Sequence, residues 1–255
     1  MSDTPAVLVT GGAKRLGAAI VRRFAREGWQ VVIHASESGA EADALAAELT
    51  AQGARAAVLQ ATFTRETDYD AVIARALALA PGLRVLVNNA SVFAFDRPET
   101  PDLAVWEQAM AVNAFAPAKL ASAFAELSRA DADRAIINVL DQKLANLNPD
   151  YFSYTASKAA LRCAGEMLAL ALAGKARVVA VAPGLSLPSA AQTEEDFARV
   201  AAVNVLERQT DPDEIAEAIW FAATGPVASG QTIHVDSGQR FVPLPRDVMF
   251  LEPSP

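Results

Sequence analysis

The sequence has few of the residues that build disulfide frameworks and metal centres. Among 255 residues there is one cysteine, Cys163, and there are two histidines, His34 and His234. A single cysteine cannot form an internal disulfide, and two distant histidines are not a spaced Cys/His ligand set. We therefore expect no metal site, and the cysteine usage fits a reducing compartment.

The sequence also lacks a long apolar run and a secretory signal. Charged residues interrupt the most apolar stretch, residues 159–182, well short of the about 18 uninterrupted apolar residues of a membrane helix. Residues 1–5 are acidic, where a secretory signal would carry basic charge. We expect a cytoplasmic protein with no membrane span.

Positive charge is in deficit. Lys and Arg number 22 against 30 Asp and Glu, a net charge of −8, which argues against a nucleic-acid partner because a phosphate backbone attracts basic surfaces. Apolar residues make up 52% of the chain and charged residues 20%, enough to bury a large core. Since α/β folds of this length often form one unit, we expect a single domain over residues 1–255.

Short apolar runs alternate along the chain with segments of helical periodicity. Strands without polar alternation are buried on both faces, which is typical of a parallel sheet between helices. The pattern predicts an α/β fold, a Rossmann-like doubly wound parallel sheet with helices on both faces. The expected strands are residues 6–10, 31–33, 57–59, 85–87, 135–139, 177–181 and 232–235, and the expected helices include 18–24, 42–49, 72–79, 154–172 and one after 212.

A glycine-rich turn joins the first expected strand to the first expected helix. Residues 10–17 read Thr-Gly-Gly-Ala-Lys-Arg-Leu-Gly. Main-chain N–H groups and a helix N-terminus at such a turn favour a bound pyrophosphate, with Gly11 allowing the tight turn and Gly17 the close approach of helix to sheet. Glycines also occur in turns that bind nothing, and the spacing here is wider than G-x-G-x-x-G. The turn alone leaves both interpretations open.

Four motifs together resemble those of the short-chain dehydrogenase/reductase family. They are the T-G-x-x-x-x-x-G turn at residues 10–17, Asn-Asn-Ala-Ser at 88–91, Tyr154-x-x-x-Lys158, and Pro183-Gly184. They stand in the family's order and cover nearly the whole chain. The resemblance implies a dinucleotide-dependent oxidoreductase with a mainly cofactor-binding half at residues 1–140, a catalytic and substrate half at 141–240, and a C-terminal tail at 241–255.

The charges near the turn indicate which dinucleotide is bound. Arg15 stands where the family's turn usually has a glycine, with Lys14 before it, and two cations favour the additional phosphate of NADPH. Ser36 replaces the carboxylate that would hold the ribose hydroxyls of NAD. Glu37 would repel that phosphate if it faced it, so we expect its side chain to point into solvent. The cofactor-binding residues that the resemblance implies are Gly11, Lys14, Arg15, Leu16, Gly17, His34, Ser36, Ser38, Asn89, Ala90, Tyr154, Lys158, Pro183, Gly184 and Ser186.

Tyr154 and Lys158 are four residues apart and share one helix face. Such pairs are common on solvated helices, but this one follows a buried strand and opens an alanine-rich helix. A nearby ammonium and a positively charged nicotinamide would lower the phenol pKa from about 10 and make proton transfer feasible. By resemblance, Lys158 also binds the nicotinamide ribose and Asn113 holds a proton-relay water. Alternatively, the Asn113 amide only caps a break in a helix.

Asp141 departs from the usual family pattern. Most members have a serine thirteen residues before the tyrosine, and a carboxylate only accepts hydrogen bonds unless it is protonated. It suits a substrate with N–H groups or a ring nitrogen awaiting a proton. In Arg15, Asn-Asn-Ala-Ser, Phe93 and Asp141-Gln142 the sequence resembles the pteridine reductases. The resemblance implies a pterin stacked between the nicotinamide and Phe93, in a substrate site of Arg15, Ser91, Phe93, Asp141 and Tyr154.

The sequence therefore predicts an NADPH-dependent reductase that transfers a hydride to the C=N bond of a dihydropterin. Plain alternatives exist: Phe93 as core packing, Ser91 as a strand end, and Asp141 as a mark of lost activity. Two rival functions stay open. One is a carbonyl or 3-oxoacyl reductase of the same family, and the other is a dinucleotide-binding regulatory protein without turnover.

Three further expectations concern assembly and closure. Apolar faces within residues 109–127 and 156–172 fit the subunit interface of a homo-oligomer, a tetramer or dimer, as well as a face buried within the chain. The loop at 185–193 and a helix near 194–204 are expected to close over the substrate. The tail at 241–255 either packs near a neighbour's active site or stays free, and its aromatic and aliphatic content favours docking.

Overall fold

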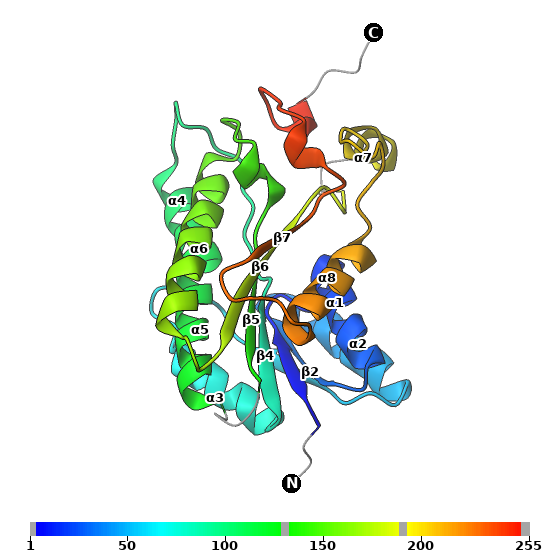
Figure 1. The fold of residues 1–255 in the computed structure, drawn as a ribbon, viewed down its shortest axis with the longest axis vertical. Coiled ribbons are helices and arrows are strands. Elements are labelled where there is room, and N and C mark those ends of the chain that lie inside the picture. Colours follow the sequence, from blue (N-terminus) through cyan, green and yellow to red (C-terminus); the bar gives the residue numbers. More distant parts are fainter. Residues whose placement is uncertain (1–3, 129–132, 189–192, 251–255) are drawn as a thin grey trace.

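Seven parallel strands form the central sheet of the computed structural model, in the order β3-β2-β1-β4-β5-β6-β7 (Figure 1). The structure describes residues 4–128, 133–188 and 193–250. The strands are β1 (Ala6–Val9), β2 (Gln30–Ala35), β3 (Ala56–Gln60), β4 (Leu83–Asn88), β5 (Ala135–Val139), β6 (Arg177–Pro183) and β7 (Thr232–Val235).

Helices cover both faces of this sheet, and Figure 1 shows α3 to α6 on one side with α1, α2 and α8 on the other. Successive side chains of a strand point to opposite faces, so Val7 and Val9 pack toward α1 and α8 while Leu8 packs toward α3 and α5. The helices are α1 (Arg15–Arg26), α2 (Gly39–Ala51), α3 (Tyr69–Leu79), α4 (Leu103–Met110), α5 (Ala116–Leu127), α6 (Phe152–Ala171), α7 (Glu194–Ala201) and α8 (Pro212–Thr224).

The predicted fold class is confirmed, and the differences lie at element ends. Strands β2 and β6 extend past the expected runs because the sheet continues through His34 and Pro183. Helix α6 begins at Phe152, two residues before the expected start, and α7 ends at Ala201 rather than near residue 204. Between β4 and β5, α4 passes through one π-helical turn, Ala111–Phe115, into α5.

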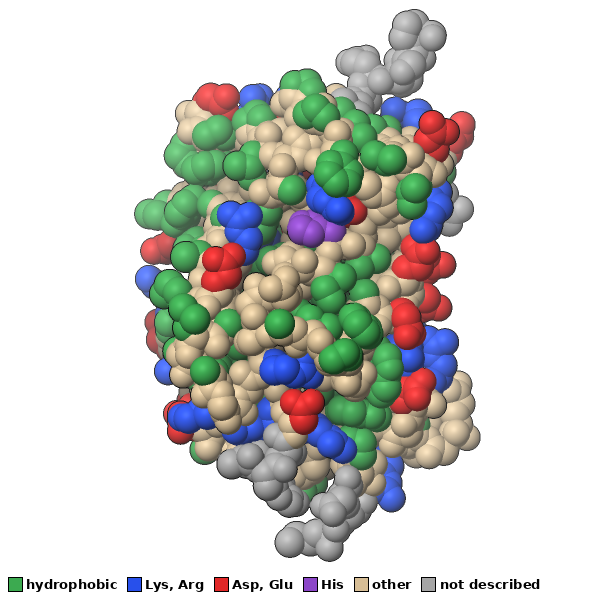
Figure 2. All heavy atoms as spheres, in the orientation of Figure 1, with side chains coloured by type: hydrophobic (Ala, Val, Ile, Leu, Met, Phe, Trp, Pro, Cys, Tyr) green, Lys and Arg blue, Asp and Glu red, His purple; other side chains and the backbone are tan. Residues whose placement is uncertain are grey.

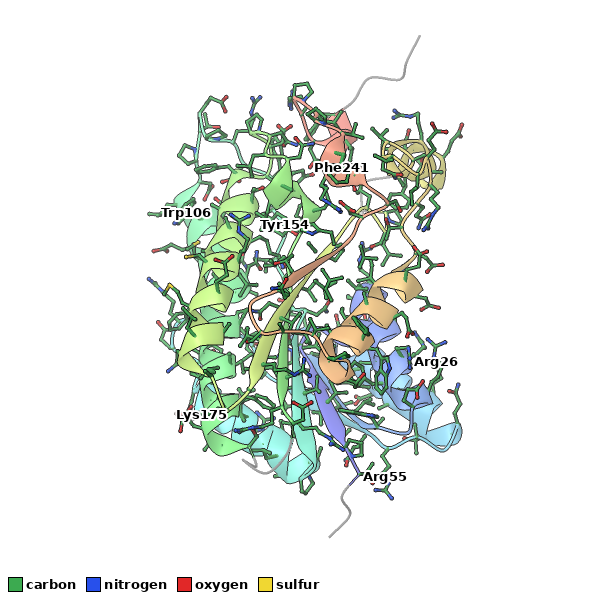
Figure 3. All side chains as sticks on the ribbon, in the orientation of Figure 1. Arg26, Arg55, Trp106, Tyr154, Lys175 and Phe241 are labelled. Atoms are coloured by element: carbon green, nitrogen blue, oxygen red, sulfur yellow. The ribbon has the colours of Figure 1, made fainter. Side chains whose placement is uncertain are left out.

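The strand order reverses direction between β1 and β4. Chain segments leaving these two neighbouring strands diverge to opposite sides, and in such sheets a crevice opens at the carboxyl ends of the strands. In Figure 3 this edge is uppermost, with Tyr154 and Phe241 near it and Arg55 and Lys175 at the other end. Local chemistry fixes the helices that surround the crevice. Asp102 caps α4, for example, by accepting hydrogen bonds from two first-turn N–H groups.

Helices α5 and α6 and the π-helical turn before α5 carry exposed apolar side chains, including Phe115, Leu127, Met167 and Leu170. Figure 2 shows apolar side chains scattered over this side of the molecule. The expected subunit interface stays a prediction. No helix in the described ranges is long and apolar enough to cross a membrane.

Candidate active site

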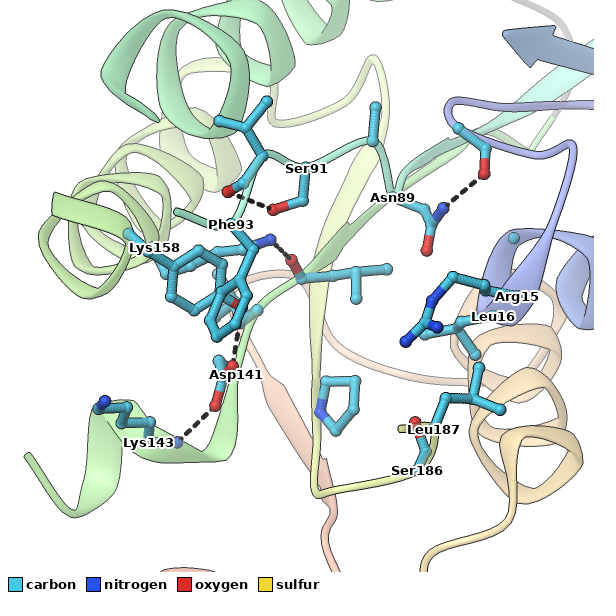
Figure 4. Close-up of a pocket in the computed structure, with 18 of the residues that line it drawn as sticks. Arg15, Leu16, Asn89, Ser91, Phe93, Asp141, Lys143, Lys158, Ser186 and Leu187 are labelled. Carbon is cyan, nitrogen blue, oxygen red and sulfur yellow. Dashed lines mark hydrogen bonds between the residues drawn. The ribbon is translucent and has the colours of Figure 1, made fainter. Parts of the chain in front are cut away.

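A cavity of ≈ 790 Å³ opens at the carboxyl ends of the strands. With the exception of Asn113, every residue that the sequence predicted for cofactor binding, substrate binding or catalysis lines it. Figure 4 shows Arg15 and Leu16 on one side, and Phe93, Asp141 and Lys158 on the other. We call these parts the turn end (residues 11–17 and 34–38) and the tyrosine end (residues 91–93, 141–158 and 242–249).

The turn end has no room for side chains at two glycines. A Cβ on Gly17 would lie 2.0 Å from the Gly11 carbonyl oxygen, and one on Gly11 would lie 3.0 Å from the Ala90 Cα. Gly11 has a φ of +60°, which also favours glycine. Asn89 holds the turn from the neighbouring strand, since its Nδ2 donates to the carbonyl oxygens of Thr10 (2.9 Å) and Gly11 (3.1 Å). The result is a bare backbone surface open to a ligand.

Arg15 occupies a backbone conformation that explains the family's usual glycine. Its φ is +56°, which costs a side-chain-bearing residue about 1–2 kcal/mol. Its Nη1 donates to the Pro188 carbonyl oxygen at 2.8 Å, so the turn contacts the loop after β6. Arg15 thus lines the cavity, and its backbone is strained in this position.

His34 is a buried structural part of the turn end. Its Nδ1 accepts from the Gly11 N–H at 3.1 Å and its Nε2 lies 3.0 Å from the Ala61 carbonyl oxygen, an arrangement that requires the neutral Nε2–H tautomer. Its ring stacks on Phe63 with centroids 4.3 Å apart. Burial lowers the pKa of His34 to about 4. His34 thus positions the glycine turn.

The region after β2 is open to solvent. Ser36 Oγ and Thr62 Oγ1 are 3.1 Å apart, and Lys14 lies 3.5 Å from the exposed carboxylate of Glu41. Glu37 is exposed, in line with the expectation from the sequence. Ser38 begins α2 without using its side chain as a cap, which leaves its hydroxyl free of that role.

Asp141, Tyr154 and Lys158 converge at the tyrosine end. The Tyr154 hydroxyl donates to Asp141 Oδ2 at 2.7 Å, while Asp141 Oδ1 accepts from the Lys143 N–H at 2.8 Å. Lys158 Nζ donates to the Val139 carbonyl oxygen at 2.8 Å and lies 5.8 Å from the Tyr154 ring centre. Helix α6 thus supplies a phenol and an amine, and the end of β5 supplies the carboxylate.

The protein's own groups shift the pKa of Tyr154 upward, the direction opposite to the expected one. Burial raises the pKa of Tyr154 well above its ordinary value, and the negative charge of Asp141 adds to this rise. Asp141 affects the Tyr154 pKa more than Lys158 does, because the carboxylate contacts the phenol directly whereas Lys158 donates its hydrogen bond to Val139. Burial also raises the pKa of Asp141, against the hydrogen bonds it accepts, and lowers the pKa of Lys158 to about 8. The Asp141–Tyr154 pair therefore holds protons tightly.

Asn113 lies behind the cavity, in the π-helical turn, and is fully buried. Its Oδ1 accepts from the Val92 N–H and Ser91 Oγ, and its Nδ2 donates to the Val92 carbonyl oxygen and Ser157 Oγ. All donors and acceptors of the amide are used. A relay water at Asn113 would have to bind main-chain atoms, and the side chain braces the loop after β4 against α6.

An aromatic wall closes one side of the tyrosine end. Phe93 is half-exposed, stacks on Tyr151 with centroids 4.0 Å apart, and meets Tyr154 edge-on at 4.7 Å. Tyr151, with a φ of +53°, was not predicted as a site residue. Its only signal in the sequence is an aromatic residue three positions before Tyr154.

The C-terminal segment, residues 242–250, was also missed as part of the site. Val242, Leu244, Asp247, Val248 and Met249 line the tyrosine end of the cavity. The tail therefore docks, as its composition favoured, but on the cavity of its own chain. Residues 251–255 lie outside the described residues.

The expected lid is described in part. Leu185, Ser186 and Leu187 line the cavity, and Gln209 Nε2 donates to the Ser186 carbonyl oxygen at 2.7 Å. Residues 189–192 lie outside the described residues, so closure over a substrate stays a prediction.

A family model described as short chain dehydrogenase matches residues 5–204, which include all four sequence motifs. The chain therefore belongs to the short-chain dehydrogenase family and is an oxidoreductase, and the resemblance stated from the motifs is confirmed.

Relatives and solved structures agree with this assignment. Pteridine reductase 1 from Leishmania tarentolae is 32% identical, covering 92% of this chain and 96% of its own length. A 3-oxoacyl-[acyl-carrier-protein] reductase from Synechocystis sp. is 31% identical, covering 91% and 95%. The structure of FolM alternative dihydrofolate reductase 1 from Brucella suis in complex with NADP is 38% identical with a TM-score of 0.89, covering 94% of this chain and 97% of that one. The relatives thus include both reductase types that the sequence left open.

Proposed function

We propose that this chain is an NADPH-dependent reductase of dihydropterins, with the pterin ring stacked on the open face of Phe93 and its reacting C=N bond beside the Asp141–Tyr154 pair. The observation that carries the proposal is the 2.7 Å hydrogen bond from Tyr154 to Asp141 inside a cavity with an aromatic wall. The pteridine reductase and FolM relatives support the same substrate class.

The turn end fits a dinucleotide with an additional phosphate. A Cβ would fill the cradle at Gly17, so backbone can approach a pyrophosphate there. Lys14 and Arg15 stand beside the cavity with Ser36 and Ser38, as a 2′-phosphate requires. When bound, NADPH supplies the hydride. Lys158 lies at the tyrosine end, where its ammonium would hold the nicotinamide ribose.

The protein's own groups would supply the proton. Reduction of a C=N bond adds a hydride to carbon and a proton to nitrogen. A protonated Asp141 can donate to a ring nitrogen, and burial favours that form by raising the pKa of Asp141. Tyr154 orients the carboxyl group through its hydrogen bond, the charge of Lys158 limits the build-up of negative charge, and the carboxylate left after the transfer takes up a proton from solvent. Stacking on Phe93 would add about 0.5–1.5 kcal/mol to the burial of a flat ring.

A carbonyl or 3-oxoacyl reductase is the second candidate because a Synechocystis relative has that activity in its name. Asp141 stands where most members of the family have a serine, and this departure from the family pattern counts against the second candidate.

The test is a panel of NADPH and NADH consumption against 7,8-dihydropterins, dihydrofolate and ketones. We expect NADPH turnover with a dihydropterin, and about 100-fold lower kcat in Asp141→Ser with NADPH affinity kept within twofold. Asp68→Ser is the matched control, because Asp68 is an exposed helix cap that serine replaces well. Reduction of ketones alone would support the second candidate. Absence of turnover, with Tyr154→Phe unchanged, would indicate a binding protein.

A further inference from the structure

We propose that Asp96 is a positioning residue of this enzyme, which fixes the Phe93 wall and the Tyr154 hydroxyl relative to each other. The proposal rests on the proposed function for the identity of the substrate. Asp96 does not line the cavity, and no sequence motif contains it.

The first turn of α6 needs an external hydrogen-bond acceptor. Its N-cap, Tyr151, is in the left-handed region and makes no side-chain cap, so the first N–H groups have no local partner. Asp96 supplies the partners from 57 residues earlier in the chain. Its Oδ1 accepts from the Ser153 N–H at 2.9 Å, its Oδ2 accepts from the Ser153 hydroxyl, and its carbonyl oxygen accepts from the Phe152 N–H at 3.2 Å.

The charge and burial of Asp96 strengthen this tie. Asp96 is 6% exposed, so water does not compete well for these hydrogen bonds. A carboxylate at a helix N-terminus also interacts favourably with the helix dipole. Ser153 precedes Tyr154 directly, so the position of Asp96 is transmitted to the phenol through one peptide unit.

The same residue fixes the other side of the site. The loop at residues 91–97 carries Phe93, and two tethers hold it. Asn113 binds Val92 at its start and Asp96 binds α6 at its end. Phe93 lies between these tethers, stacked on Tyr151 and edge-on to Tyr154. Loss of the second tether would let the wall and the phenol move apart, whereas no hydrogen bond joins Asp96 to the turn end in the described residues.

The experiment compares Asp96→Ala, Asp96→Asn and Ser153→Ala, with Asp102→Ala as control. Asp102 caps α4 in the same chemical manner but is exposed and away from the cavity. With 7,8-dihydrobiopterin, Asp96→Ala should raise KM about tenfold and lower kcat about tenfold, because misplacement of reacting groups by 1 Å is costly. The Kd of NADPH should stay within twofold. Asp96→Asn should restore most of the loss, since its amide can accept from the Ser153 N–H and donate to its hydroxyl.

A readout independent of turnover is amide hydrogen exchange, which should accelerate in Asp96→Ala at residues 91–97 and 151–154 alone. Ser153→Ala removes one hydrogen bond and keeps the fold. It should therefore raise KM and lower kcat by about threefold each, with faster exchange in the same residues. Faster exchange with unchanged kinetics, or an equal loss of NADPH affinity, would overturn the proposal. If the wild type reduces only ketones, the proposed function fails, and the same variants assayed with that ketone still test Asp96.

Discussion

The two ends of the cavity are held together in different ways. At the turn end, main-chain atoms, tight glycine packing and a neutral imidazole fix the surface. At the tyrosine end, side chains from residues 91–97, 141–154 and 242–250 meet through buried carboxylates and stacked rings. The first end depends on steric exclusion at the glycines and on hydrogen bonds from the neighbouring strands to the main chain of the turn, and the second depends on side-chain contacts between distant segments. We therefore expect mutations at the two ends to affect different kinetic constants.

The largest effect should come from closing the turn end. In Gly17→Ala the new Cβ would lie 2.0 Å from the Gly11 carbonyl oxygen, a main-chain atom that cannot rotate away. We expect at least 100-fold weaker NADPH binding by fluorescence titration, a lower Tm, and equal losses with every substrate, because a displaced turn no longer approaches the pyrophosphate.

Gly39→Ala is the control for this change, since its Cβ would meet only the Gln60 side chain at an ordinary 3.5 Å. A Gly17→Ala protein that binds NADPH within threefold of wild type would show that steric exclusion does not define the turn end.

An intermediate effect should come from releasing the C-terminal segment at the tyrosine end. Asp150 is fully buried, and its Oδ2 accepts from Arg246 Nε at 2.7 Å and the Asp247 N–H at 2.8 Å. Its carbonyl oxygen accepts from Lys143 Nζ, which also donates to Asp247. Burial opposes the charge of Asp150, but these hydrogen bonds outweigh it and keep its pKa below the ordinary value.

In Asp150→Ala we expect the dihydropterin KM to rise about tenfold while the NADPH Kd changes less than twofold, because residues 242–249 line the tyrosine end of the cavity and not the turn end. Glu48→Ala, which breaks an exposed pair with Arg22, is the control and should leave both constants unchanged. Equal effects on both constants would remove the distinction between the ends.

The same contrast explains what the sequence could predict. The turn end and the Tyr154–Lys158 pair follow from local rules, since strand ends, glycines and residues four apart on a helix have fixed relations in space. The tethers of the tyrosine end have no such rule. Asp96 and Ser153 are 57 residues apart, and Lys143 and Asp247 are 104 apart. No local sequence pattern predicts which residues these side chains will contact.

Two local expectations also depended on tertiary contacts. The pKa of Tyr154 was expected to be lowered by Lys158 together with a bound nicotinamide, whereas among the protein's own groups burial and the nearby Asp141 raise it. His34 was predicted to bind the cofactor, and this stays a prediction: it lines the cavity, but its two ring nitrogens already bond to Gly11 and Ala61, which its own strand could not show. A contact between strands cannot be read from one strand's sequence.

The smallest effect should come from His34, and it sharpens the comparison through pH. Burial lowers its pKa from 6.5 to about 4 in the folded state. Between these values the unfolded chain binds a proton that the folded chain does not, so this group's contribution to stability is complete above pH 6.5 and is lost as the pH falls toward 4. The expected slope is about 1.4 kcal/mol per pH unit.

His34→Gln keeps an acceptor for the Gly11 N–H and a donor for the Ala61 carbonyl oxygen but cannot titrate. At pH 7 we expect no more than about a threefold change in NADPH Kd, since each hydrogen bond is replaced. In denaturant unfolding between pH 6.5 and 4, the variant should lose less stability than wild type, while other acids contribute equally to both. Burial lowers the pKa of His234 as well, but this residue is exposed, so His234→Gln should depart from wild type less than His34→Gln does. If stability falls with pH equally in His34→Gln and wild type, His34 is protonated in the folded state over this range. The turn end would then contain a buried charge, as the tyrosine end does.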